Sequence, residues 1–212
     1  MKESSVARGT SRAEAAAATR RRVVAAAERL LLAEGWAGTT IRKVATEAGV
    51  SQETIYKGFG GKAALLKAVY DVRIAGDDRE IPIAEREGIA RLIAAATPAE
   101  AADAWAAHAL TIQARSAPVM ALALGARAGE PELAAFLQTT AAERMTGAAN
   151  AAAHWDQHGW LRVPVDEARE RIWLLGSPAS YLDLTSLGWE RDRLHAWHRE
   201  WLLAFVLTSD GE

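Results

Sequence analysis

The chain of 212 residues contains no cysteine. Disulfide bonds and thiolate metal sites are therefore excluded, and the absence fits a reducing compartment. No uninterrupted apolar run reaches the roughly 18–20 residues that a membrane-spanning helix requires. The first residues are polar and basic, with no apolar stretch behind them, so we expect no secretory signal peptide and a cytoplasmic location.

Motifs of the common enzyme classes are also missing. There is no glycine-rich phosphate or dinucleotide loop and no HExxH zinc motif, and Gly176-Ser177-Pro178 lacks the pattern of a nucleophile elbow. His154 and His158 are four residues apart and could share a metal-binding face, but no third ligand is evident, which favours surface histidines. We therefore expect no catalytic residue, no metal and no cofactor.

Charge is spread unevenly along the chain. Residues 1–79 contain 14 lysines and arginines against 9 aspartates and glutamates, whereas residues 80–212 contain 11 against 18. The first part therefore carries a formal charge of +5 and the second −7, which agrees with the net −2 of the whole. A basic front on an acidic body favours a polyanionic partner, although chance clustering in a tail would give the same pattern.

Period-two alternation and β-branched runs are scarce, whereas alanine, leucine, glutamate and arginine dominate, so the sequence predicts an all-α protein. A capping-box pattern from Ser11 to Glu14 begins a first helix that runs to about Glu34, before Gly35. Pro178 is expected to kink the penultimate helix, because its ring clashes with the carbonyl of Leu174. The later helices are expected near residues 52–57, 62–75, 84–95, 98–115, 117–127, 131–158, 166–187 and 190–207.

Residues 38–59 have the pattern of two short helices joined by a tight turn. Thr39 or Thr40 can cap the first helix, Gly49 can adopt the left-handed turn conformation, and Ser51 can cap the second helix. Such a helix-turn-helix places its second helix in the DNA major groove. The residues expected to face the core are all apolar, namely Ile41, Val44, Ala45, Ala48, Val50, Ile55 and Phe59.

These residues resemble the amino-terminal signature of the tetracycline-repressor (TetR) family of transcriptional regulators. The matching residues are Gly38-Thr39-Thr40-Ile41-Arg42-Lys43-Val44-Ala45, Glu47-Ala48-Gly49-Val50-Ser51, Thr54-Ile55-Tyr56, Phe59, Lys62 and Leu65-Leu66. The resemblance implies an amino-terminal three-helix DNA-binding domain followed by a helical domain for ligand binding and dimerisation. We expect a basic arm at residues 1–19, the DNA-binding domain at 20–76 and the second domain at 77–212. The arm is expected to be helical from about residue 11.

The resemblance also implies which residues contact DNA. Thr40 and Arg42 would touch phosphates, and Lys62 at the start of the fourth helix would anchor another phosphate near the helix amino terminus. Gly58 replaces the histidine or tyrosine usual in the family, which removes a phosphate contact at that position. Base and phosphate contacts on the second helix of the motif would come from Gln52, Glu53, Thr54, Tyr56 and Lys57.

A basic arm precedes the motif, with Arg8, Arg12 and the run Arg20-Arg21-Arg22. Such arms can enter a neighbouring minor groove, and a solvated tail is the alternative.

The second domain is expected to hold a small effector. Its candidate lining residues are large or polar side chains on the middle helices, namely Trp105, His108, Ile112, Met120, Phe136, Arg144 and Trp173, although ordinary core packing is the favoured interpretation for each of them. Arg144 is out of place on an apolar stripe and would recognise an anion, pair with an acidic neighbour or reach solvent. Apolar residues of the last helix, Leu194, Trp197, Trp201, Leu202 and Phe205, are expected at a dimer interface.

The sequence thus predicts a cytoplasmic bacterial regulator, associated with the nucleoid when bound to DNA. It would bind a palindromic double-stranded operator as a homodimer and repress until a small, largely hydrophobic effector releases it. The fourth helix is expected to be the only continuous element between the DNA-binding part and the ligand domain. The alternatives are a helical adaptor or ligand-binding protein of the same fold that does not bind DNA, and an enzyme.

Overall fold

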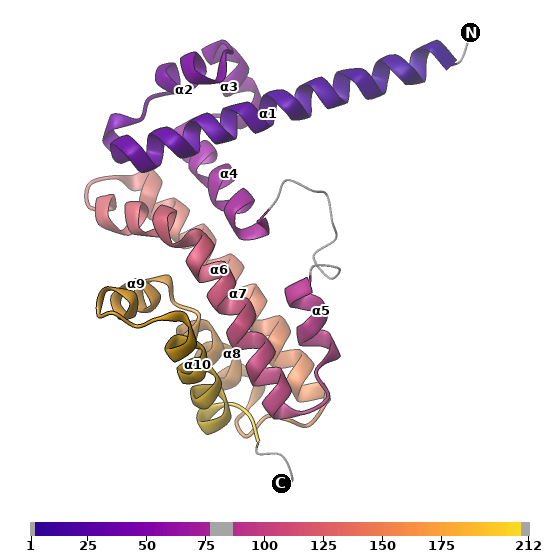
Figure 1. The fold of residues 1–212 in the computed structure, drawn as a ribbon, viewed down its shortest axis with the longest axis vertical. Helices are drawn as coiled ribbons and strands as arrows, with labels where there is room; N and C mark the ends of the chain where they lie inside the picture. The colour runs from indigo at the N-terminus through magenta and orange to yellow at the C-terminus, as the bar shows by residue number, and fades with distance from the viewer. Residues whose placement is uncertain (1–2, 77–86, 209–212) are drawn as a thin grey trace.

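The computed structural model describes the backbone of residues 3–76 and 87–208, and the side chains from residue 13 onward within these ranges. The described chain is helical apart from turns and one isolated antiparallel bridge between Leu161 and Leu207, which confirms the all-α class. Figure 1 shows a small group of four helices at one end of an elongated bundle. The first four helices are α1 (Glu3–Gly38), α2 (Ile41–Ala48), α3 (Gln52–Phe59) and α4 (Lys62–Ala75).

Helix α1 is longer than predicted. It begins at Glu3 rather than near Ser11, so the capping-box pattern from Ser11 to Glu14 lies inside the helix and does not begin it. Its amino-terminal half extends away from the other helices (Figure 1). Gly35 has a positive φ of 71° with ψ −175°, a backbone conformation that is nearly restricted to glycine, so the regular helix ends there and a short turn follows to Gly38.

The six later helices form the second part of the chain. In Figure 1, α6 and α7 run along its length, and α8, α9 and α10 lie together on one side of them. Their bounds are α5 (Glu87–Ala94), α6 (Pro98–Ala126), α7 (Pro131–Gln157), α8 (Val165–Leu175), α9 (Pro178–Ser186) and α10 (Arg191–Phe205).

Two prolines act differently from the prediction. Residues 98–115 and 117–127 were expected as two helices, but α6 continues through Pro118, and the Ser116 hydroxyl bonds the Ile112 carbonyl just before it. Pro178 was expected to kink one helix, but it begins α9 at the first helical position, where its missing N–H costs nothing. Ser177 caps that helix by accepting a bond from the Ser180 N–H.

The buried apolar residues form two clusters. One cluster lies under the first four helices and also contains Val119, Met120, Ala123, Leu133 and Phe136 from the adjoining ends of α6 and α7. The other cluster joins the amino-terminal half of α6 to the carboxyl-terminal half of α7 and to α8 and α10. The first cluster is therefore shared between the first four helices and the second part of the chain.

The predicted seam at residues 76–82 lies outside the described residues except for Gly76, which ends α4 with a φ of 79°. Within the described ranges, no helix is long and apolar enough to cross a membrane.

Candidate nucleic-acid interface

Local hydrogen bonds define both helices of the predicted motif. The Thr40 side chain caps α2 by accepting a bond of 3.2 Å from the Lys43 N–H, while Thr39 is buried and donates to the Gly35 carbonyl. At the other end of α2, Gly49 adopts φ 66° and ψ 43°, which favours glycine. The turn is closed by the Val50 N–H, which bonds the Ala45 carbonyl at 3.0 Å.

Ser51 begins α3 in the same way. Its hydroxyl oxygen accepts a bond of 3.1 Å from the Thr54 N–H and lies 2.9 Å from the Thr54 hydroxyl. Ile55 is completely buried and holds the helix against the core, with Val44 and Ala45 of α2 buried in the same cluster. The motif thus has the predicted apolar base, and α3 is fixed by one side only.

The opposite side of α3 is exposed and polar. All five residues predicted to contact bases and phosphates point away from the core, and Tyr56 is 53% exposed. Lys57 pairs with Glu53 across one helical turn at 2.7 Å, a bond between exposed groups that is weak and easily exchanged for a phosphate. The exposed set comprises Gln52, Glu53, Thr54, Tyr56 and Lys57.

Part of the predicted basic arm braces the motif. The Arg22 Nε–H donates a bond of 3.3 Å to the carbonyl of Ala48 at the end of α2, and the Arg20 guanidinium lies 4.6 Å from the centre of the Phe59 ring at the end of α3. Both arginines therefore connect α1 to the two motif helices, a role that sequence spacing did not indicate. The side chains of Arg8 and Arg12 lie outside the described residues.

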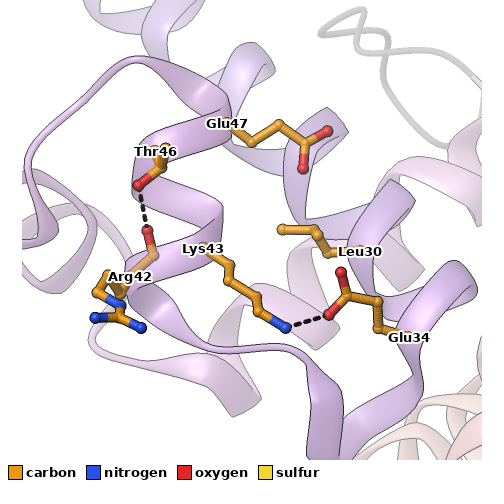
Figure 2. A pocket seen from close by; sticks show the side chains of 6 residues that line it. All are labelled: Leu30, Glu34, Arg42, Lys43, Thr46 and Glu47. Carbon is orange, nitrogen blue, oxygen red and sulfur yellow. Dashed lines mark hydrogen bonds and ion pairs between the residues drawn. The ribbon is translucent and has the colours of Figure 1, made fainter.

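An open groove of about 560 Å³ lies between α1 and α2 (Figure 2). Lys43 crosses it to an ion pair of 2.5 Å with Glu34, and Arg29 pairs with Glu47 at 2.6 Å, so two ion pairs join these helices. In Figure 2 the Arg42 side chain points away from Glu34 and Lys43. Arg42 is exposed, and it is therefore free to meet a phosphate, as predicted for this position.

Lys62 lies in a more enclosed place than the prediction assumed. Its ammonium donates a bond of 2.8 Å to the Trp36 carbonyl and lies 3.9 Å from the centre of the Trp36 ring. Burial lowers the pKa of Lys62, and the charges of Glu130 and Glu132 act in the opposite direction. Lys62 thus ties α4 to the end of α1, and the ammonium has two further protons for a phosphate.

The amino terminus of α4 offers a second kind of anion contact. Gly61 precedes the helix without any side-chain cap, so the first N–H groups of α4 are not occupied by a side chain. Gly58 is exposed, and a side chain there would meet no atom within 4 Å. The position therefore has room for a Cβ but offers no side chain for the phosphate contact that the resemblance implies.

The predicted effector-lining residues do not form one site. Met120 and Phe136 belong to the first apolar cluster, where Phe136 packs edge-on against Tyr70. Trp105 belongs to the second cluster and contacts the buried His198. His108 is half-buried against Gly88 of α5, and Ile112 is half-buried. Within the predicted set, Arg144 and Trp173 are the pair that the structure brings into contact, with the guanidinium 4.6 Å from the ring centre.

The predicted dimer residues also divide. Leu194 and Leu202 are buried in the single chain, because α10 packs closely along α6, so their place at a dimer interface is a wrong prediction. Trp197 and Trp201 are half-buried, and Phe205 is 49% exposed. Sequence analysis missed Leu174 and Leu187, which are 58% and 74% exposed on or next to the neighbouring helices α8 and α9.

His154 and His158 lie with their ring centres 4.6 Å apart, and Trp160 stacks on the second ring. The described residues contain no group of three or more histidine or carboxylate side chains that would hold a metal ion.

Comparison with known proteins places the motif in a family. Residues 23–69 match the sequence profile of the bacterial regulatory proteins of the tetR family. This match spans the part of α1 that packs on the motif, both motif helices and the first half of α4, and it confirms the resemblance found in the sequence. No curated protein is significantly similar to the chain.

Solved structures share the fold along nearly the whole chain. A regulator from Mesorhizobium loti assigned to the TetR family is 16% identical, with a TM-score of 0.63 over 90% of this chain and 96% of its own. A protein from Saccharomonospora viridis assigned as a transcriptional regulator, crystallised with choline, is 18% identical, with a TM-score of 0.62 over 90% and 98%. The complex of SmeT with triclosan is 18% identical, with a TM-score of 0.62 over 92% and 93%. Identities this low establish the fold alone.

Proposed function

We propose that the protein is a ligand-responsive transcriptional regulator, because residues 23–69 match the tetR family of bacterial regulatory proteins. It binds a palindromic operator as a homodimer in the bacterial cytoplasm and represses transcription until an effector releases it. It uses no catalytic chemistry, metal or cofactor in doing so.

The observation that carries this proposal is that α3 has one face buried in the core and the opposite face polar and exposed. The helix is fixed by the buried Ile55 and capped by Ser51, and it presents an unbroken polar face to solvent. A protein-docking face would be more apolar, whereas hydroxyl, amide and ammonium groups match the edges of bases and the phosphates. Arg42 and the open amino terminus of α4 lie on either side of α3 in the chain and supply phosphate contacts.

A dimer is required by the geometry of operator reading. One α3 contacts about half of a typical operator, and two copies related by a twofold axis would place their α3 helices about 34 Å apart, one turn of DNA. We place the dimer interface on the exposed apolar residues of α8 and α10, Leu174 and Phe205, with the half-buried Trp201. These residues replace the buried Leu194 and Leu202 of the sequence prediction.

The effector is proposed to bind among the helices of the second part. Two proteins of the same fold hold small organic molecules, choline in one and triclosan in the other. The fold therefore accommodates such ligands, and control requires only that the ligand favours a dimer whose α3 helices are wrongly spaced for the operator.

The experiment that tests the proposed function is a mobility shift with the DNA upstream of the protein's own gene. We expect a discrete complex with two protomers on one DNA, whose affinity falls steeply as salt rises because bound cations are released from the DNA. A mutant operator with one half-site scrambled is the matched control and is expected to bind at least tenfold more weakly. Equal binding to both DNAs, or no binding at low salt, would favour an adaptor that kept the fold without reading DNA.

A further inference from the structure

Arg144 is a half-buried cation without an ionic partner in the described part of the chain. Its Nε–H has no hydrogen-bond partner, and the guanidinium lies against the Trp173 ring. Burial lowers the pKa of Arg144, and the one group that opposes this change is Tyr70, a neutral phenol at neutral pH. The acidic neighbour that the sequence left open is thus absent among the described residues. An N–H group that is shut off from solvent without an acceptor is costly, so an anion that accepts the Nε–H bond would be favoured at this position.

Gln113 of α6 is a second unsatisfied polar group. The residue is 4% exposed, and its Oε1 has no hydrogen-bond donor. Its Nε2 makes a single long bond of 3.5 Å to the Ser177 carbonyl. Exchanging the two ends of the amide would place its oxygen against the Ser177 carbonyl, so that two acceptors would face each other and the one existing bond would be lost.

Both side chains meet the same short break in the chain. Gln113 approaches Ser177 from α6, and Arg144 approaches the preceding residue from α7, with its Cδ 3.5 Å from the position that a Cβ of Gly176 would occupy. Gly176 and Ser177 join α8 to α9, and the α9 N–H groups begin here. A helix amino terminus adds a positive dipole end to the guanidinium.

We propose that the junction between α8 and α9 binds a small organic carboxylate that also carries a hydrogen-bond donor. The carboxylate would accept bonds from Arg144, and a hydroxyl or amine of the ligand would donate to Gln113. The apolar side of the ligand would lie toward the Trp173 ring, whose indole N–H is already occupied by the Ala141 carbonyl at 3.0 Å. This site gives the effector of the proposed function a chemical class, and its role in control rests on that function.

The position of Arg144 connects the site to the DNA-binding part. Tyr70 of α4 is close enough that the Arg144 charge acts on its hydroxyl, and Tyr70 packs edge-on on Phe136 of α7 at 5.5 Å between ring centres. Neutralising Arg144 with a ligand therefore changes the surroundings of a buried residue in α4. Helix α4 carries Lys62 at its other end, next to the motif.

The experiment measures thermal unfolding of the full chain without DNA, in the presence of lactate, 10-hydroxydecanoate, 4-hydroxybenzoate or salicylate, each of which carries both a carboxylate and a hydroxyl. Each acid is paired with its neutral amide, which has the same shape and lacks the charge. We expect one or more carboxylates to raise the Tm of the wild type by about 2–4 °C at several times its Kd. The paired amide is expected to leave the Tm unchanged. In Arg144→Met the Kd of that carboxylate, titrated by tryptophan fluorescence, should rise at least tenfold, as for a lost bond to a charged group.

Arg169→Met is the matched control, because the Arg169 Nε is also buried without a partner while its guanidinium pairs with Asp166 at 3.1 Å. This variant should respond like the wild type, and Gln113→Met gives a second, uncharged probe of the site if Arg144→Met folds poorly. Failure of every carboxylate, equal protection by acid and amide, or protection that survives both Arg144→Met and Gln113→Met overturns the proposal. The assay contains no DNA, so its failure would contradict the carboxylate site and say nothing about operator binding. Conversely, a failure of the mobility shift would contradict the proposed function and leave carboxylate binding to be measured on its own.

Discussion

The indole Nε1 of Trp36 donates a hydrogen bond of 3.0 Å to the carboxylate of Glu130. Trp36 lies at the end of α1 and Glu130 immediately before α7, so the bond joins the DNA-binding part to the turn between α6 and α7. The Trp36 carbonyl also receives the Lys62 ammonium. A side-chain hydrogen bond therefore joins the two parts in addition to helix α4.

Breaking this link should weaken both stability and control. We expect Glu130→Ala to cost about 1–3 kcal/mol, because a buried indole N–H loses its charged acceptor. The effect of an effector on operator affinity should shrink in the same variant. Thermal unfolding and operator titration with and without effector measure the two changes. Glu132→Ala is the control, since Glu132 is exposed at the start of the same helix and does not bond Trp36. An equal Tm change in both variants would contradict this role of Glu130.

The two helix caps separate stability from DNA reading. Ser51→Ala removes the cap of α3 and Thr97→Ala removes the equivalent cap of α6, and each should cost about 1 kcal/mol. Operator affinity should fall in Ser51→Ala alone, because the fraying helix end is the one that reaches the bases. Chemical denaturation and a mobility shift on both variants provide the comparison. Similar operator binding by the two would mean that the start of α3 does not contact DNA.

Phosphate and base contacts should differ in their dependence on salt. Arg42→Ala is expected to weaken binding to all sequences alike and to reduce the salt slope by about one unit, as one phosphate contact is lost. Thr54→Val should instead alter preference among operator variants and leave the slope unchanged. Fluorescence anisotropy over a range of salt concentrations measures both. Arg91→Ala on α5 is the control for the general effect of removing a surface arginine. A change of base preference in Arg42→Ala would reverse the assigned roles.

Stability should fall as the solution becomes acidic. Burial lowers the pKa of His198 below its ordinary value of 6.5, with the His195 charge acting in the same direction. The unfolded chain then binds a proton more readily than the folded chain, so the free energy of unfolding is highest above pH 6.5 and decreases as pH falls toward the lowered pKa. Denaturant unfolding at pH 7.5 and at pH 5.5 measures the loss, which His198→Gln should reduce. An identical loss in the variant would place the proton uptake elsewhere.

The exposed apolar residues should mediate self-association. Leu174→Glu places a charge at the proposed interface and is expected to shift the protein toward monomer and to weaken operator binding at least tenfold. Ile93→Glu on α5 is the control, because Ile93 has a similar exposure of 55% against 58% and helix α5 lies on the other side of α6 and α7 in Figure 1. Sedimentation at micromolar concentration reports the mass. A wild-type monomer under these conditions, or an unchanged dimer of Leu174→Glu, would contradict the interface.

The DNA-binding motif was predictable because its signals are local. Thr40, Gly49 and Ser51 each act on residues within five positions, so a cap or a left-handed turn can be read from spacing. The contacts of Lys62 and Arg22 were not predictable, since their partners Trp36 and Ala48 lie 26 residues away.

The second part was less predictable, because the apolar face of a helix does not indicate which other helix it packs against. Trp105 and Phe136 were placed in one pocket on the basis of residue type, yet they belong to different clusters. Alanine-rich faces allow helices to approach in several ways, and the choice is made by packing between distant segments. Pro178 illustrates the same limit. The same local sequence is compatible with a proline inside one long helix and with a proline that begins a new helix, and the structure decides between them because Ser177 caps α9.

The apolar cluster shared by the first four helices and the tips of α6 and α7 bears on how such proteins are recombined. Residues 1–76 transplanted alone onto another ligand domain would leave the surfaces that meet Met120, Leu133 and Phe136 without their partners. A hybrid regulator with this operator preference would therefore fold well only if residues 119–123 and 133–136 of this chain were transferred together with residues 1–76. For this chain, the transferable module for building new genetic sensors is discontinuous in sequence.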